Sequence, residues 1–149
     1  MFKKIWVYGS PFSGKTTFAT GAEDHFVLST DGNAQYVTDN YKVLTDEVTV
    51  NGRITTRKLA WEVFKEELDK LEAGTKYKTI IVDLVEDTYE MARLYMYKKL
   101  GITHESDDSF RAWDKTRTEY LSTMRRLMNL PYDIVLISHE DTSKDITKK

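Results

Sequence analysis

The chain has 149 residues, enough for one domain with a sizeable core but too few for two. Its formal net charge of −2 gives no overall basic signal for nucleic acid, and the absence of cysteine excludes disulfide frameworks and cysteine-ligated zinc. No signal peptide and no run near the ~20 apolar residues of a membrane span is visible, so we expect a soluble cytoplasmic protein with no membrane partner.

The first elements predicted along the chain are two strands separated by a helix. Residues 4–8 are typical of a short buried strand, and residues 14–20 should open a helix that ends at Gly21. Residues 25–29, HFVLS, predict a second strand, and the TDGN that follows is typical of a tight turn.

A hairpin and a helix are predicted next. Asn51-Gly52 separates two alternating segments in EVTVNGRITT, residues 47–56, which is a strong signal for a β-hairpin. This hairpin could be an arm for nucleic acid or another subunit, or a decoration of the sheet edge. The segment after it carries apolar residues at helical spacing and stops at Gly74.

The second half of the chain continues the alternation. YKTIIVD, residues 77–83, predicts a third core strand that ends at Asp83. The other predicted elements are a helix, a long helix and a core strand: residues 86–100, 110–130 and 133–140. Strands that alternate with helices and are almost continuously apolar indicate a mostly parallel sheet covered on both faces, so we predict a three-layer α/β fold.

One stretch carries a specific phosphate-binding pattern. Residues 9–16, GSPFSGKT, form a complete G-x-x-x-x-G-K-T between a predicted strand and a predicted helix. Such a loop turns backbone N–H groups toward phosphate at a helix N-terminus, Lys15 would reach the β- and γ-phosphates, and Thr16 would bind Mg²⁺. The alternative is a glycine-rich turn without a ligand. The expected nucleotide-binding residues are Gly9, Ser10, Pro11, Phe12, Ser13, Gly14, Lys15, Thr16 and Thr17.

Polar residues near the strand ends are candidates for the rest of the site. Asp83 closes its strand and suits the carboxylate that holds the water shell of Mg²⁺, or it merely caps the next helix. Asp31 is the first candidate for orienting the attacking water, although any tight turn could use it, and Glu86 and Glu140 are weaker candidates. His139 would point at the γ-phosphate if its strand lies between the phosphate-loop strand and the Asp83 strand; the alternative is a surface histidine.

Aromatic and basic residues on two predicted helices allow two interpretations. Trp61, Phe64, Phe110 and Trp113 have helical spacing, which favours core positions over a platform for base stacking. KTRTEYLSTMRR, residues 115–126, could face DNA, but we favour a solvated helix face.

Four segments together resemble one family, the RecA-like P-loop ATPases of phages, also described as phage nucleotide-binding proteins and linked to single-strand annealing in recombination. In chain order the segments are IWVYGSPFSGKTTFA, FVLSTDGNAQY, YKTIIVDLVEDTYE and IVLISHED. The resemblance implies ATP and Mg²⁺ as cofactors and slow ATP hydrolysis. It also implies work on single-stranded DNA, with a single-strand-binding protein as partner, as homo-oligomers, in the host cytoplasm.

The resemblance also implies residue roles and a strand order. Lys15 and Thr16 match the P-loop pair, Asp83 the magnesium carboxylate and His139 a polar sensor. Asp31 stands where RecA-like proteins usually carry a catalytic glutamate, so the identity of the base stays open. The implied strand order 1-4-3-2 leaves the P-loop strand at an edge. Such cores continue beyond a fourth strand, so we expect one RecA-like core over residues 1–149, truncated at its C-terminus.

Two other functions fit the P-loop. FSGKTT, residues 12–17, is similar to the loop of RecA-like thymidine kinases, but those carry an acidic residue after the strand aspartate and cysteine zinc sites. Here Leu84 follows Asp83 and cysteine is absent, which disfavours a nucleoside kinase. A non-hydrolysing, nucleotide-gated module of phage replication or packaging also fits, because a P-loop indicates binding rather than turnover.

Overall fold

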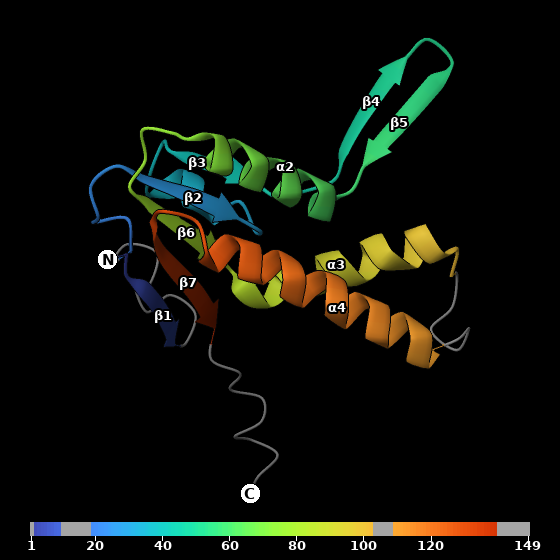
Figure 1. The fold of residues 1–149 in the computed structure, drawn as a ribbon. Coiled ribbons are helices and arrows are strands. Elements are labelled where there is room, and N and C mark those ends of the chain that lie inside the picture. Colours follow the sequence, from blue (N-terminus) through green and yellow to red (C-terminus); the bar gives the residue numbers. More distant parts are fainter. Residues whose placement is uncertain (1, 10–18, 103–108, 140–149) are drawn as a thin grey trace, which may run out of the picture. The chain divides into compact units, whose positions relative to one another are not determined.

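The computed structural model describes residues 2–9, 19–102 and 109–139 (Figure 1). It divides into two compact units. The first unit comprises residues 1–43, 76–86 and 132–149, and the second comprises residues 44–75 and 87–131. The first holds a β-sheet, and the second holds a hairpin and most of the helical residues.

The sheet of the first unit has five strands, and every neighbouring pair is parallel. Their order is β1-β7-β6-β2-β3, which confirms the predicted order 1-4-3-2 and adds β3 at one edge. The strands are β1 (Lys4–Gly9), β2 (His25–Ser29), β3 (Tyr41–Val43), β6 (Thr79–Asp83) and β7 (Asp133–His139). Together with the helices, this sheet confirms the predicted α/β fold class.

Apolar side chains of the central strands form the core of the first unit. All five residues of β6 are buried, and Val27 of β2 and Ile137 of β7 have no exposed surface. Ala19 is buried in the same cluster, three residues after the end of the phosphate-binding pattern. Residues buried on both faces of a parallel sheet need continuous apolar runs, which is why these strands were readable from the sequence.

The prediction that β1 is a buried strand was wrong. Among the described strands β1 pairs only with β7, so it lies at an edge of the sheet. Trp6 and Tyr8 are 63% and 72% exposed, and Ile5 is also exposed. Apolar composition identified the strand, but it could not distinguish an edge strand from a central one.

The second unit contains a β-hairpin and helical residues of three helices. The helices are α2 (Ala60–Ala73), α3 (Val85–Leu100), which begins in the first unit, and α4 (Ser109–Met128). The carboxylate of Asp46 accepts a hydrogen bond from the Ala60 amide at 2.8 Å, and that of Glu62 accepts one from the Leu59 amide at 2.8 Å. These two acceptors satisfy otherwise unpaired donors at the start of α2. None of the described helices is long and apolar enough to cross a bilayer.

The hairpin comprises β4 (Glu47–Asn51) and β5 (Ile54–Lys58), close to the predicted range. Asn51 pairs with Ile54, so the two loop residues are Gly52 and Arg53 rather than Asn51 and Gly52. Gly52 has φ 65°, a left-handed conformation that glycine adopts without steric cost.

The predicted core positions of four aromatic residues are half right. Trp61 and Phe64 of α2 have no exposed surface. Phe110 and Trp113 of α4 are 79% and 53% exposed, so their assignment to the core was wrong. Helical spacing places both pairs on one side of a helix, but it does not say which side meets the core.

We expect Thr116→Val to raise the free energy of unfolding by about 1 kcal/mol. Thr116 of α4 is 1% exposed, and within the described residues its hydroxyl is the buried side-chain polar atom that has no hydrogen-bond partner. Valine has nearly the same shape and removes the unsatisfied hydroxyl. Urea unfolding of both proteins measures the difference, with Thr118→Val at an exposed position of the same helix as control. Equal or lower stability of Thr116→Val would contradict the expectation.

Candidate functional site

Several predicted site residues lie together at the carboxyl ends of the parallel strands in the first unit. Gly9 ends β1 and pairs in register with His139, which ends β7. Asp83 ends β6 and pairs with Ser29 of β2 on one side and with Ile137 of β7 on the other. In open parallel sheets ligands bind at the carboxyl ends of the strands. His139 therefore extends two residues beyond the level of Asp83, on a strand between β1 and β6, the position that the predicted sensor role would require.

Asp83 is held at the end of its strand by Thr30, which follows β2. The Asp83 carbonyl accepts hydrogen bonds from the Thr30 amide at 2.7 Å and the Thr30 hydroxyl at 3.4 Å. The same hydroxyl accepts from the Leu84 amide at 3.0 Å. Asp83 is 3% exposed. A buried carboxylate on a fixed backbone is an oxygen donor of the kind that Mg²⁺ prefers, so this position fits the predicted metal.

Asp31 is exposed, and its carboxylate is hydrogen-bonded to neighbouring residues of the turn that contains it. Its carboxylate accepts hydrogen bonds from the Asn33 amide at 3.0 Å, the Asn33 side-chain amide at 3.1 Å and the Ser29 hydroxyl at 3.3 Å. Gly32, with φ 78°, donates its amide to the Ser29 hydroxyl and leads into the short helix η1 (Asn33–Tyr36). This arrangement is an Asx-type turn, the alternative that the sequence left open for this residue.

Glu86 contacts the end of β7. Its carboxylate accepts a hydrogen bond from the His139 backbone amide at 2.9 Å. Glu86 lies in the first turn of α3, three residues after Asp83, so this hydrogen bond connects the end of β7 to the start of that helix. The sequence offered Glu86 only as a weak catalytic candidate, and neither this contact nor the role of Thr30 had a signal in it.

The remaining predicted site residues lie outside the described residues. They are Ser10, Pro11, Phe12, Ser13, Gly14, Lys15, Thr16, Thr17 and Glu140. Gly9 directly precedes Ser10 at the end of β1, and buried Ala19 lies two residues after Thr17. In the described part of the chain no group of three or more His, Cys, Asp or Glu side chains could hold a metal ion.

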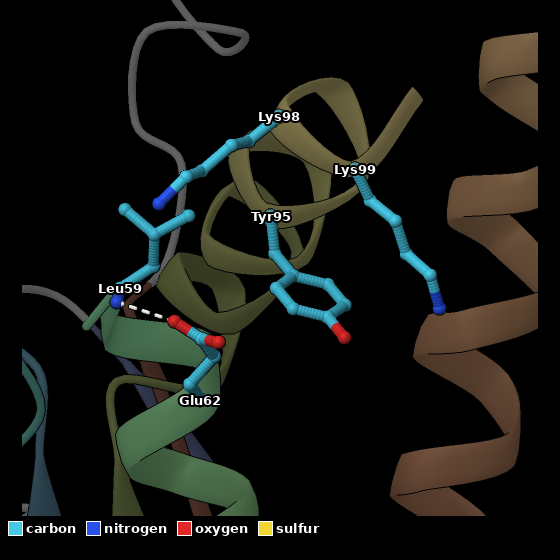
Figure 2. Close-up of a pocket in the computed structure, with 5 residues that line it drawn as sticks. All are labelled: Leu59, Glu62, Tyr95, Lys98 and Lys99. Atoms are coloured by element: carbon cyan, nitrogen blue, oxygen red, sulfur yellow. Dashed lines mark hydrogen bonds between the residues drawn. The ribbon is translucent and has the colours of Figure 1, made fainter. Parts of the chain in front are cut away.

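A pocket in the second unit was not predicted from the sequence. It has a volume of about 310 Å³ and is lined by Leu59, Glu62, Tyr95, Lys98 and Lys99 (Figure 2). The Glu62 carboxylate is bound to the Leu59 amide at the pocket wall. The Lys99 ammonium lies 5.9 Å from the centre of the Tyr95 ring and extends toward α4 (Figure 2). The lining is therefore a mixture of cationic, aromatic and carboxylate groups.

Close to this pocket, Glu119 of α4 joins α4 to α2. It accepts hydrogen bonds from Lys65 Nζ at 2.7 Å and from the buried Trp61 Nε1 at 3.1 Å. Burial tends to raise the pKa of Glu119, but these hydrogen bonds and the charges of Lys65 and Lys99 outweigh it, so the pKa lies below its ordinary value. A lowered folded-state pKa stabilises the protein above the ordinary glutamate pKa, and this contribution is lost as the pH falls through the folded value.

We therefore expect Glu119→Ala to lower the free energy of unfolding at pH 7 by about 2 kcal/mol, because it leaves the Trp61 N–H buried without an acceptor. Glu119→Gln should cost less, since its amide oxygen can still accept from Trp61. Both variants should lose stability less steeply than the wild type below pH ~4.5, where glutamate becomes protonated. Urea unfolding at several pH values measures this. Parallel acid profiles for the wild type and Glu119→Gln would contradict it.

The fold and the site together define a class of protein. A parallel sheet with a G-x-x-x-x-G-K-T pattern directly after its first strand, and a buried aspartate at the end of a nearby strand, is a P-loop NTPase. The AAA domain family matches residues 1–149, and the chain belongs to this family. Neither a search of curated proteins nor a search of solved structures found a match. The family match supports nucleotide binding by an ATPase of the P-loop type, without separating the RecA-like phage group from others.

Proposed function

We propose that this protein is a Mg²⁺-dependent ATPase that acts on single-stranded DNA in phage recombination or single-strand annealing. One observation carries the nucleotide part of the proposal: Gly9, Asp83 and His139 end three adjacent parallel strands, and the GKT loop follows Gly9 directly. The DNA part is supported by the resemblance of four ordered segments to RecA-like phage ATPases, with a single-strand-binding protein and further copies of the chain as proposed partners.

The proposed roles follow from the chemistry of each group. The loop amides and Lys15 bind the β- and γ-phosphates and neutralise their charge. Thr16 directly, and Asp83 through water, would hold Mg²⁺, which when bound offsets the negative charge that develops on the phosphates. Asp31 would orient the attacking water, a role that requires its carboxylate to exchange a turn hydrogen bond for one to water.

His139 is proposed as the sensor of the γ-phosphate. Its backbone amide donates to Glu86 in the first turn of α3, so a movement of the end of β7 would be transmitted to that helix. The residue lies two positions beyond the level of Asp83, which supports a contact with the terminal phosphate rather than with the metal.

One observation favours a second function, a nucleotide-gated module that binds without turnover. The Asp31 carboxylate, the leading candidate for the base, is engaged by three donors of its own turn. A carboxylate used in this way stabilises the loop and contributes nothing to water activation. In this alternative the P-loop binds nucleotide, and ATP controls assembly in phage replication or packaging.

The test is steady-state ATP hydrolysis by the full chain with Mg²⁺ or with excess EDTA, and with or without oligodeoxythymidine. Turnover that needs Mg²⁺ and rises with the oligonucleotide would support the ATPase. Binding of a fluorescent ATP analogue without any turnover would support the nucleotide-gated module instead. Failure to bind the analogue would contradict both functions.

A further inference from the structure

Helix α4 carries an exposed row of side chains for which the sequence allowed a DNA-facing role but favoured core or solvated positions. Trp113, Arg117, Leu121 and Arg125 follow each other at intervals of four residues, and Phe110 lies beside the first of them; we name these five residues the α4 ridge. Side chains four residues apart are neighbours on one helix surface, separated by a rise of about 6 Å. Phe110 and Trp113 are 79% and 53% exposed, and Leu121 is 42% exposed.

The aromatic end of the α4 ridge is organised by contacts between its own members. The ring centres of Phe110 and Trp113 are 6.5 Å apart, and the planes are inclined by 34°. The guanidinium of Arg117 lies 5.9 Å from the centre of the Trp113 ring. Two aromatic rings and a planar cation are therefore neighbours on the surface of α4. Exposed aromatic groups that lie together in this way indicate a binding surface.

The charge of α4 is opposite to that of α2. Helix α4 has five basic and two acidic residues, whereas α2 has two basic and five acidic ones. One of the two acidic residues of α4, Glu119, is bound to Lys65 of α2, and Arg126 pairs with Asp69 and Glu72. The exposed side of α4 therefore keeps a cationic excess, including Arg117 and Arg125, on a chain whose net charge is −2.

We propose that the α4 ridge is a binding site for single-stranded nucleic acid. Unpaired bases would stack on Phe110 and Trp113, and Arg117 and Arg125 would contact the phosphates. Stacking platforms interleaved with cations are the chemistry by which proteins bind single strands without reading their sequence. The proposal rests on the proposed function for DNA as the partner, but it assigns the contact to a surface outside the nucleotide loop.

The positive charge of the α4 ridge favours single-stranded nucleic acid over a protein partner. Exposed aromatic residues and arginine would also suit a protein interface, whether with another protein or a second copy of the chain. A polyanion is favoured because the charged residues of the ridge are both cationic, although the chain is acidic overall. A strand with unpaired bases is favoured over a duplex, since two exposed rings side by side offer stacking faces and a paired base does not reach them.

The experiment is a titration of fluorescein-labelled oligodeoxythymidine with the full chain, followed by fluorescence anisotropy at several salt concentrations. Phe110→Ala combined with Trp113→Ala should weaken binding by about 10- to 100-fold. Arg117→Ala should reduce the slope of log affinity against log salt by about 0.7. Two matched controls should bind like the wild type: Tyr36→Ala removes an exposed aromatic ring of η1, and Lys70→Ala removes an exposed cation of α2.

The outcomes separate this proposal from the proposed function. The ridge variants should bind and hydrolyse ATP like the wild type when DNA is absent. If the wild type does not hydrolyse ATP, the proposed ATPase function is contradicted, but the measured binding of the oligonucleotide still tests the α4 ridge. The α4 ridge proposal would be overturned by ridge variants that bind the oligonucleotide as tightly as the controls, or by a wild type that does not bind it. Variants that change the sedimentation of the protein but not oligonucleotide binding would overturn it in favour of a protein interface.

Discussion

Lys15→Ala is expected to abolish detectable ATP turnover, a loss of at least about 100-fold, while the far-UV circular dichroism and the unfolding midpoint stay near those of the wild type. A preorganised cation on the phosphates contributes to the transition state more than to the fold, and removing one such group typically costs 10²–10³ in rate. The loop begins at Gly9, which pairs with His139 of β7, and buried Ala19 lies two residues after it, so one changed side chain inside the loop should leave the sheet intact.

The matched control is Lys78→Ala, which removes an exposed lysine of the same unit whose ion pair with Asp24 is 3.8 Å long. It should keep full turnover. A fluorescent ATP analogue distinguishes loss of binding from loss of chemistry in Lys15→Ala. Unchanged turnover in this variant would refute the assignment of residues 9–17 as the phosphate-binding loop.

Asp83→Asn is expected to lower Mg²⁺-dependent turnover by about 10- to 100-fold, the usual effect of losing a group that holds a metal through water. The amide keeps the shape of the side chain and removes its charge. Because the site is 3% exposed and the Thr30 bonds go to the Asp83 carbonyl, the backbone at the end of β6 should stay in place. The measurement is turnover against Mg²⁺ concentration, together with nucleotide binding in EDTA, which should not change.

Asp133→Asn is the control for this variant. Asp133 begins β7, at the amino end of the strands and so at the opposite end of the sheet from Asp83, and its carboxylate accepts a hydrogen bond from the Lys3 amide at 2.7 Å. Its replacement should not shift the Mg²⁺ requirement. If both variants respond to Mg²⁺ as the wild type does, Asp83 is a structural residue, and its proposed part in the metal site fails.

The central strands of the sheet could be predicted because buried strands consist mostly of apolar residues. HFVLS predicted β2 with its observed ends, and the apolar run from Ile80 to Val82 predicted β6. Gly74 correctly marked the end of α2, where its φ of 105° suits glycine. β3 was missed because its three residues, Tyr41 to Val43, are too few to show a period.

Exposure was harder to predict than secondary structure. Trp6 and Tyr8 read as core residues because apolar strands usually are, but the position of β1 at the sheet edge leaves them accessible. Phe110 and Trp113 were assigned to the core because their helical spacing is typical of a buried helix face. Which side of an element meets solvent depends on what packs against it, and that is a property of the tertiary structure.

The candidate site was predictable as far as strand ends determine it. Because the strands are parallel, Gly9, Asp83 and His139 all lie at the carboxyl ends of the strands, and the order of the strands places β7 between β1 and β6. The hydrogen bonds around Asp31 and the contact of Glu86 with the His139 amide depend on side-chain geometry at turns. No spacing in the sequence encodes them. The roles of all these residues stay predictions until the variants are measured.

The edge position of β1 has an energetic consequence for the loop that follows it. A strand joined to the described sheet by one ladder can detach at a lower free energy than a central strand, without unfolding of the rest. If the loop binds nucleotide as proposed, and only while β1 is in place, the ligand would oppose that local opening by RT ln(1 + [L]/Kd), about 2.7 kcal/mol at a concentration of 100 Kd. On this proposal we expect the local stability of β1 to rise with nucleotide concentration.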